Sequence, residues 1–473
     1  MSRHDLPFLL PLMVPAASAV LVLLLIALRR SHALTAWVTL AGLAGCLAAV
    51  VRVAPLAPRP VTALLIVDQY ALFFTGLIAA AAGAVVLLSW DYLAARRGNR
   101  EEYYLLLLLA TTGSAVLVAS THFASLFLAL ELLSVSLYGL IAYSRNNALS
   151  VEAGIKYLVL AGFSSAFLLL GMAFVYGSRG SLAFAEVRGG AAPTDPLLIG
   201  GLALILVGMG FKLALVPFHW WTPDVYQGAP APVAGFIATV SKGAVFAVLL
   251  RFFAPWARFG PELQEVFALL AVASILVGNL LALRQRSLKR LLGYSSIAHM
   301  GYLLVAFLAG GRWAVTAAAF YLAAYFITNL AAFGVVALLS TPEREADDLE
   351  DYAGLAWRRP GPAAVLIAAL LSLTGIPLTA GFVGKFYLMA AGVSAGLWLP
   401  VIALVVGSGI GLYYYLRVII AVCREPEGGE ARAVTAPVVG GAALAGLGLL
   451  LVWVGVYPGP LVELVQRIAE RLY

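Results

Sequence analysis

Residues 196–217 read Pro-Leu-Leu-Ile-Gly-Gly-Leu-Ala-Leu-Ile-Leu-Val-Gly-Met-Gly-Phe-Lys-Leu-Ala-Leu-Val-Pro, and Lys212 is the one charged side chain among them. A helix that crosses the hydrocarbon core of a bilayer needs about 20 predominantly apolar residues. The stretch therefore predicts a transmembrane helix. It holds a lysine inside the membrane and has Gly208, Gly210 and Pro217 close to that lysine.

The rest of the chain repeats this apolar pattern. We count fourteen runs of similar character, at residues 7–28, 33–51, 62–90, 103–120, 122–143, 153–177, 196–217, 230–255, 264–283, 291–310, 313–340, 361–392, 396–422 and 434–457. Each run must be helical, because lipid offers no partner to an unpaired backbone amide. Continuous apolarity also argues against a membrane β-barrel. The sequence predicts an all-α polytopic membrane protein of about 14 helices.

Composition excludes several other classes. Of the 473 residues, 63% are hydrophobic and 11% charged, against about 45–50% and about 25% in soluble domains. This excludes a soluble multi-domain enzyme and a disordered chain. The two cysteines, Cys46 and Cys423, are too few for a C-x-x-C metal site or a disulfide framework. We predict no metal and no cofactor in this chain.

The net charge of +7 is interpreted as topology, without a nucleic-acid partner. Basic residues cluster in alternate loops, as at Arg29-Arg30, in the segment 284–290 and at Arg358-Arg359. Loops rich in Lys and Arg face the cytoplasm. With fourteen spans, both termini are then predicted to lie outside, in a multi-pass protein of the cell inner (plasma) membrane.

Lysine is the informative residue. The chain has five, and only Lys289 lies in a loop-like basic cluster, whereas the others lie in or at the edge of apolar spans: Lys156, Lys212, Lys242 and Lys385. A charge at mid-bilayer costs at least about 2.5–3.5 kcal/mol. Arg stays protonated, whereas a buried Lys can lose its proton. We predict that these four lysines carry protons. The alternative is snorkelling to the headgroups, which suits Lys156 near the start of its span.

One carboxylate lies about eight residues into a span. Glu131 needs a cation or water nearby, and Ser134 is placed to help solvate it. We predict that Glu131 pairs with an intramembrane lysine, either to tune its protonation or as a static ion pair. Asp68 lies near the start of its run, where interfacial hydration is a sufficient explanation.

Helix breakers recur beside a second lysine. The segment 375–385 reads Gly-Ile-Pro-Leu-Thr-Ala-Gly-Phe-Val-Gly-Lys, inside the run 361–392, which is too long for one straight span. Broken helices at membrane depth line protein or a hydrated cavity. Their occurrence at matching places in two halves indicates inverted repeats with an ion path between them.

Histidine and hydroxyl side chains add a possible relay. His219 lies in an aromatic, proline-rich segment between two lysine spans, and His299 follows Tyr294 and Ser295 in an apolar span. Imidazole titrates near neutrality and hydroxyls both donate and accept, so such a chain with water can pass protons. For His299, a hydrogen-bonded packing role is equally open.

Three stretches carry a family resemblance: Phe-His-Trp-Trp-Thr-Pro-Asp-Val-Tyr-Gln-Gly-Ala-Pro (218–230), Ser-Leu-Lys-Arg-Leu-Leu-Gly-Tyr-Ser-Ser-Ile-Ala-His-Met-Gly-Tyr (287–302) and Gly-Ile-Pro-Leu-Thr-Ala-Gly-Phe-Val-Gly-Lys-Phe (375–386). On these the chain resembles the antiporter-like membrane subunits of respiratory complex I, the NADH-quinone oxidoreductase. Lys385 favours the N and L types, because the M type usually has Glu there. The missing long lateral helix of the L type leaves subunit N as the most similar.

The resemblance implies ten core helices in two inverted five-helix repeats. Residues 1–100 would hold helices 1–3, residues 101–256 the first repeat (helices 4–8), residues 257–425 the second repeat (helices 9–13), and residues 426–473 helix 14 and the tail. It implies a Glu131–Lys212 pair with Lys156 beside it. Lys242 and His299 would bridge the repeats, with Lys385 as the far-side relay. His219, Ser134, Tyr294 and Ser295 would support it.

The resemblance also implies partners. Other complex I membrane subunits and the redox arm would surround the chain, and they would hold the NADH, FMN, iron–sulfur clusters and quinone. The chain itself would have no redox centre and would act as a proton-translocating subunit of the enzyme. Two alternatives stay open: a cation/proton antiporter subunit of the Mrp type, and a structural membrane subunit whose buried charges are static.

Overall fold

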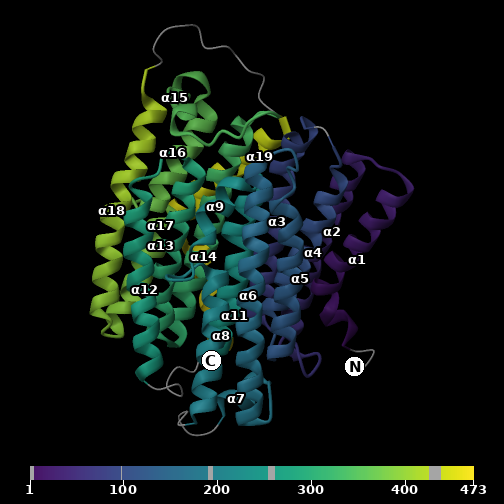
Figure 1. Ribbon diagram of the computed structural model, residues 1–473, viewed down its shortest axis with the longest axis vertical. Coiled ribbons are helices and arrows are strands. Elements are labelled where there is room, and N and C mark those ends of the chain that lie inside the picture. Colours follow the sequence, from purple (N-terminus) through teal and green to yellow (C-terminus); the bar gives the residue numbers. More distant parts are fainter. Residues whose placement is uncertain (1–4, 97, 190–194, 254–260, 426–437, 473) are drawn as a thin grey trace.

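The computed structural model describes residues 5–96, 98–189, 195–253, 261–425 and 438–472 (Figure 1). Within these residues, 13 helices are long and apolar enough to cross a membrane, which confirms the all-α polytopic class. The helices are α1 (Leu6–Leu28), α2 (His32–Val53), α3 (Gln69–Ala94), α4 (Glu101–Val118), α5 (Phe123–Ile141), α6 (Ala148–Arg179), α7 (Phe184–Arg188), α8 (Pro196–Leu213), α9 (Trp221–Gly228), α10 (Ala231–Phe236), α11 (Lys242–Phe253), α12 (Pro261–Ala282), α13 (Leu288–Ala309), α14 (Gly311–Leu339), α15 (Leu355–Arg358), α16 (Pro360–Thr374), α17 (Ala380–Ser394), α18 (Trp398–Cys423), α19 (Val438–Val456) and α20 (Gly459–Leu472).

The long run 361–392 is two helices, as the glycines and proline predict. The first, α16, ends at Thr374 because Gly375 adopts a left-handed conformation with φ of 87°. The second, α17, starts at Ala380, where the Thr379 hydroxyl accepts a hydrogen bond from the Phe382 amide and caps the helix. Glycine has no Cβ to oppose the left-handed backbone, so the break lies where the sequence places it.

The opening stretch is broken at its end as well. Helix α8 stops at Leu213, where Ala214 is left-handed with φ of 59°, and the short helix α9 resumes at Trp221. After Pro230, α10 passes through a π-helical turn, η2 (Ile237–Ser241), directly into Lys242 at the start of α11. π-Helical turns inside α-helices are frequent at functional sites.

Burial divides the bundle into a core and a rim. The continuous helical segment 231–253 and the helices α13 and α14 are almost wholly buried, whereas α1, α2, α6 and α19 are buried over about a third of their length. In Figure 1, α1 and α2 lie along one edge of the bundle and α18 along the other. The lysine helix α11 therefore lies in the protein interior, and its side chains are buried against other helices.

Small residues bring the helices of the first half close together. A Cβ placed on Gly171 of α6 would lie 2.6 Å from the carbonyl oxygen of Gly201 in α8. Close backbone approach through small residues is a typical way to associate membrane helices. A short hairpin between α2 and α3, β1 (Arg59–Pro60) paired antiparallel with β2 (Ile66–Val67), was not predicted. Two of the predicted domain boundaries, 256/257 and 425/426, border or lie in stretches outside the described residues, and the inverted repeats stay a prediction.

Candidate functional site

Lys212 lies near the end of α8 with 2% of its surface exposed. Its Nζ donates to the Ser134 hydroxyl of α5 at 2.7 Å, and Ser134 donates in turn to the Leu130 carbonyl. Glu131, one helical turn before Ser134, accepts a hydrogen bond from Ser165 of α6. Among the described residues Glu131 and Lys212 form no direct ion pair, and each is hydrogen-bonded to a different serine.

An aromatic wall separates Lys212 from the next lysine. The Lys212 ammonium lies 5.4 Å from the ring centre of Tyr157 and 5.6 Å from that of Phe211. Trp221 packs against both rings, with its ring centre 5.0 Å from that of Tyr157 and 5.5 Å from that of Phe211. Its indole N–H donates to the Phe211 carbonyl. Negative ring faces stabilise a cation without offering it a proton acceptor.

Lys242 lies on the other side of that wall and is completely buried. Its Nζ donates to Ser296 of α13 at 2.7 Å and lies 5.8 Å from the Trp221 ring. Ser296 is a junction, because the hydroxyls of Tyr226 and Tyr325 bond to it as well, at 3.1 and 2.9 Å. The structure thus links Lys242 to α13 through a hydroxyl group.

His299 lies one turn beyond Ser296 on α13 and is 2% exposed. Its Nδ1 bonds to the Tyr321 hydroxyl at 2.6 Å and its Nε2 to the Tyr415 hydroxyl at 3.4 Å. Ser295 shares the same Tyr415 hydroxyl. The imidazole is therefore bonded on both nitrogens to hydroxyl groups, which a relay between hydroxyls requires.

Lys385 fills the break between α16 and α17. Its Nζ donates to the Thr374 carbonyl at 2.9 Å, a group that the interrupted helix leaves free, and to Ser408 of α18 at 3.1 Å. It lies 4.9 Å from the ring centre of Tyr302, and 5% of the residue is exposed. Like Lys212 and Lys242, it has no carboxylate partner among the described residues.

Gly375 makes room for the Lys385 stem. A Cβ on Gly375 would lie 2.9 Å from Lys385 Cδ, and its backbone is left-handed. We expect Gly375→Ala to displace the lysine and to destabilise the protein by about 1–3 kcal/mol, the usual cost of such a conformation. The midpoint of thermal unfolding of the purified protein should fall. Gly361→Ala, with nothing within 4 Å of the added Cβ, is the matched control.

Lys156 does not join this group. Its Nζ pairs with Glu152 and with Asp224 of α9, both at 2.7 Å, and 43% of its side chain is exposed. It lies nine residues along α6 from Ser165, or about 14 Å at ~1.5 Å per residue. Asp224 also binds Arg290 at 2.7 Å. The environment of Lys156 is a surface ion-pair network, separate from the Glu131 region.

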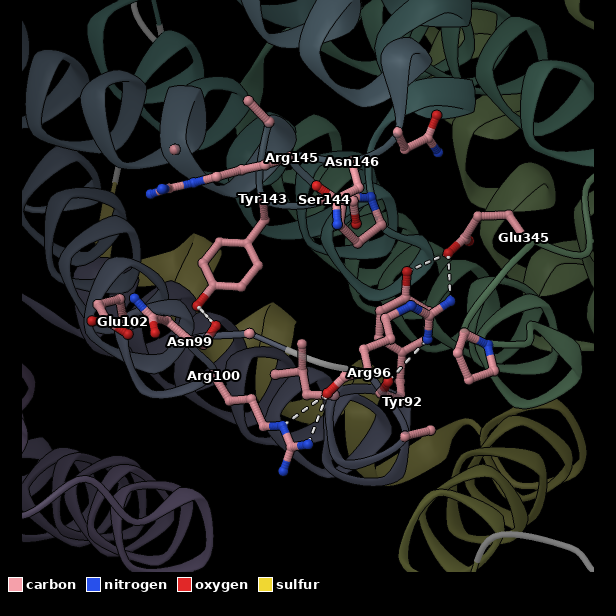
Figure 2. Close-up of a pocket in the computed structure, with 18 of the residues that line it drawn as sticks. Tyr92, Arg96, Asn99, Arg100, Glu102, Tyr143, Ser144, Arg145, Asn146 and Glu345 are labelled. Atoms are coloured by element: carbon pink, nitrogen blue, oxygen red, sulfur yellow. Dashed lines mark hydrogen bonds and ion pairs between the residues drawn. The ribbon is translucent and has the colours of Figure 1, made fainter.

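A polar cavity of about 1210 Å³ opens at the end of the bundle that carries the basic loops, between the α3–α4 and α5–α6 connections and the segment after α14. Figure 2 shows Arg96 and Glu345 joined on one side of it, and the Tyr143 hydroxyl on Asn99 on the other. Behind Glu345 lies Lys289, with its Nζ 3.4 Å from that carboxylate.

Lys289 overturns a sequence prediction. Its place in a basic cluster indicated a loop residue, yet it is fully buried and also donates to the Ala229 carbonyl at 2.7 Å. The segment after α14 folds back over the start of α13, which the basic composition of 284–290 could not indicate. Its carboxylate partner Glu345 is 14% exposed at the cavity. Among the described residues this ion pair distinguishes Lys289 from the other three buried lysines.

Asp68 is a second correction. The sequence predicts interfacial hydration for it, but it is buried and binds Arg251 of α11 through two hydrogen bonds of 2.7 and 2.8 Å. It also caps α3 by accepting from the Ala71 amide. Arg251 donates further to the Val118 carbonyl and lies 4.8 Å from the Tyr70 ring. The pair ties α3 and α4 to the end of the lysine helix.

Two predicted supporting residues make fewer contacts. His219 is buried and stacks on Trp220, and its Nδ1 has no partner among the described residues. Tyr294 is partly buried against the core, and no hydrogen bond to its hydroxyl occurs in the described part of the chain. Sequence reasoning missed Ser165, Ser296, Ser408 and the tyrosines around His299. The high density of hydroxyls in apolar spans was the signal available for them.

Comparisons with known proteins agree on one family. The family described as "NADH:quinone oxidoreductase/Mrp antiporter, TM" matches residues 120–411. A protein of Methylococcus capsulatus named NADH-quinone oxidoreductase subunit N is 51% identical over 477 residues, which cover 99% of this chain and 96% of that protein. A chain of respiratory complex I from Thermus thermophilus, solved with bound aureothin, aligns with a TM-score of 0.83 and 36% identity, over 96% of this chain and 98% of that one.

The Mrp alternative finds a more distant relative. A chain of the Mrp complex from Dietzia sp. aligns with a TM-score of 0.88 over 99% of this chain and 98% of that one, at 22% identity. At that identity the likeness extends to the fold alone. The high-identity relatives therefore decide the family, and the fold is shared more widely.

Proposed function

The chain belongs to the subunit N family of NADH-quinone oxidoreductase, and from this premise we propose that it carries protons across the membrane within that complex. One observation supports this above the rest. Lys212, Lys242 and Lys385 lie buried in the helix bundle and are bonded to serine hydroxyls, and among the described residues none of them forms a direct ion pair with a carboxylate. Static ammonium groups would be costly there, whereas amines that exchange protons suit a relay.

The proposed trigger lies at Glu131. A conformational or electrostatic pulse from the redox arm changes the distance between Glu131 and Lys212, and an opposite charge close by favours the protonated amine. Glu131 is bonded to Ser165 and Lys212 to Ser134, so each can change partner without unfolding a helix. Moving the carboxylate away releases the proton toward Lys242, His299 and finally Lys385.

The same premise assigns the redox groups to other subunits of the complex. NADH, FMN, iron–sulfur clusters and quinone belong to partner subunits, and this chain takes part in the enzyme as a translocating subunit without a redox step of its own. In this proposal the basic loops around Arg96 and Arg290 face the cytoplasm and both termini lie outside the plasma membrane.

Lys212→Ala tests the proposal. In the purified complex reconstituted in proteoliposomes, we expect the subunit to be present and NADH-driven proton uptake to fall by about 10²-fold, the low end of what a positioned proton-transferring group contributes. Glu131→Ala should act in the same direction. The control is Lys156→Ala, which removes a partly exposed ion pair. Full pumping by Lys212→Ala would contradict the proposal and leave a subunit with static charges.

Sodium separates the proposal from the Mrp-type alternative. A proton-carrying subunit should give the same pumping in proteoliposomes that contain potassium salts with and without added Na⁺. If the pumping instead requires Na⁺, and Lys212→Ala loses both the pumping and Na⁺ transport, a cation/proton antiporter is favoured.

A further inference from the structure

A row of polar side chains leads from the His299 region to Lys385, and an amide lies in the middle of it. Tyr415, which bonds His299, packs against Tyr414 with the ring centres 4.4 Å apart. The Tyr414 hydroxyl bonds to Asn279 Oδ1 at 2.9 Å, and Asn279 Nδ2 bonds to the Tyr302 hydroxyl at 2.9 Å. The Lys385 ammonium lies 4.9 Å from the Tyr302 ring centre and donates to Ser408. Of the side chains in this row, Asn279 of α12 alone is neither a hydroxyl nor a titrating base.

The orientation of the Asn279 amide is determined by the backbone. Its Nδ2 also lies 2.8 Å from the Ile275 carbonyl, which can only accept a hydrogen bond. The amide atom that faces this carbonyl must therefore be the nitrogen, which excludes the flipped orientation of the amide. The Tyr302 hydroxyl accepts a hydrogen bond from the same nitrogen. Oδ1 can only accept, so Tyr414 must donate to it. The hydrogen bonds therefore run in one direction, with Tyr414 donating to the amide and the amide donating to Tyr302 on the Lys385 side.

The neighbouring helix leaves space for this amide. Asn279 is fully buried, and a Cβ on Gly407 of α18 would lie 2.8 Å from its Nδ2 and 3.1 Å from the Tyr302 hydroxyl. One turn further, a Cβ on Gly411 would lie 3.5 Å from Asn279 Oδ1 and from the Tyr414 hydroxyl. Two glycines of α18 thus form a cradle around the point where the amide meets both tyrosines.

An amide holds hydroxyls but does not pass protons on. A hydroxyl can accept a proton on its oxygen and release its own, so it returns to the same chemical form. A carboxamide that took a proton from Tyr414 at Oδ1 and released one at Nδ2 would be left as its unfavourable imidic-acid tautomer. Asn279 therefore aligns Tyr414 and Tyr302 while it interrupts proton transfer between them.

We propose that Asn279 is a positioning residue that insulates Lys385 from His299 until the complex turns over. The inference rests on the proposed function and adds a barrier to it. At rest, the proton of Lys385 cannot equilibrate with His299 through the tyrosines. Transfer waits for a rearrangement that brings water or a hydroxyl round the amide, so that proton movement stays coupled to quinone reduction.

Two kinds of substitution at Asn279 distinguish a role in blocking proton transfer from a role in packing: side chains that can relay a proton and a side chain that cannot. Asn279→Asp introduces a carboxyl group of the same shape. In its protonated form it can take the Tyr414 proton on one oxygen as it gives its own proton from the other oxygen to Tyr302, and it ends as the same carboxylic acid; Tyr414 gains a proton from its outer neighbour and Tyr302 passes its hydroxyl proton on. Asn279→Ser introduces a shorter side chain with a hydroxyl and leaves room for a water beside it, and the two can relay together. Asn279→Leu fills the site and cannot relay. The matched control is Asn329→Asp, because Asn329 of α14 is also buried and donates to the carbonyl four residues before it, Tyr325.

The purified complex in proteoliposomes gives two readouts: protons pumped per NADH oxidised, and passive proton leak under an imposed potential without NADH. We expect Asn279→Asp and Asn279→Ser to raise the leak by about tenfold or more, below the ~10²–10⁴-fold that a positioned proton-transferring group contributes. The pumping ratio should fall while NADH oxidation continues. Asn279→Leu and Asn329→Asp should show no added leak.

Each result decides one point. If Asn279→Asp does not assemble, Asn279→Ser carries the test alone. If the assembled Asn279→Asp or Asn279→Ser variant shows no added proton leak and a full pumping ratio, the proposed insulating role is wrong. An equal leak in Asn279→Leu would also contradict it, because that leak would indicate loosened packing. These outcomes are distinct from failure of the proposed function, which is full pumping by Lys212→Ala.

Discussion

Replacing Lys242 by methionine should abolish NADH-driven proton uptake while leaving the complex assembled. Lys242 is completely buried between the aromatic wall and Ser296. Methionine has a similar length and no proton to carry, and an apolar replacement for a buried charge is often neutral for stability. Ser296 keeps the Tyr226 and Tyr325 hydroxyls as partners. The measurements are proton uptake and quinone reduction by the purified complex in proteoliposomes.

Lys242→Arg sharpens this prediction. Arginine preserves the positive charge but stays protonated in proteins, so a relay should fail with it as completely as with methionine. If the charge of Lys242 merely stabilised the fold, the arginine variant would pump and the methionine variant would not. Lys156→Met is the control, since loss of a surface ion pair costs about 0–1 kcal/mol. Pumping by Lys242→Met at the unmodified rate would contradict the relay.

Arg251→Met should destabilise the subunit more than any other single change discussed above. The substitution leaves the Asp68 carboxylate buried without its cation, and breaking a buried ion pair in this way costs about 3–5 kcal/mol. Asp68 would keep only its cap on the Ala71 amide among the hydrogen bonds described above. We expect the variant complex to lose this subunit at a lower temperature, measured by its retention in the purified complex after heating.

The double variant Arg251→Met with Asp68→Asn should recover most of the loss. It removes both charges, and asparagine still caps a helix about as well as aspartate. Arg59→Met is the matched control for an arginine–aspartate pair, because Arg59 binds Asp5 at 3.1 Å with 48% of its side chain exposed. Equal retention of the subunit in Arg251→Met and Arg59→Met would show that the buried pair contributes little.

The sequence predicted the membrane class and the location of the charges with few errors. Burial in a bilayer imposes a local rule, about 20 apolar residues per span, and such a rule can be applied along the chain without knowing the fold. The same locality made the break at Gly375 predictable, because a glycine and a proline act on their own backbone. The rarity of lysine then identified Lys212, Lys242 and Lys385, which the structure places inside the bundle.

The contact partners of these charged residues could not be predicted from the sequence, because they come from distant parts of the chain. Lys156 faces Asp224 and not the Glu131 region, and the buried state of Lys289 depends on a segment more than 50 residues further along that folds back over it. Asp68 and Arg251 are 183 residues apart. Asn279 was unremarked in the sequence and matters only because α13 and α18 bring tyrosines to both sides of its amide. Local apolarity determined which residues enter the membrane, and helix packing alone decided which of them meet.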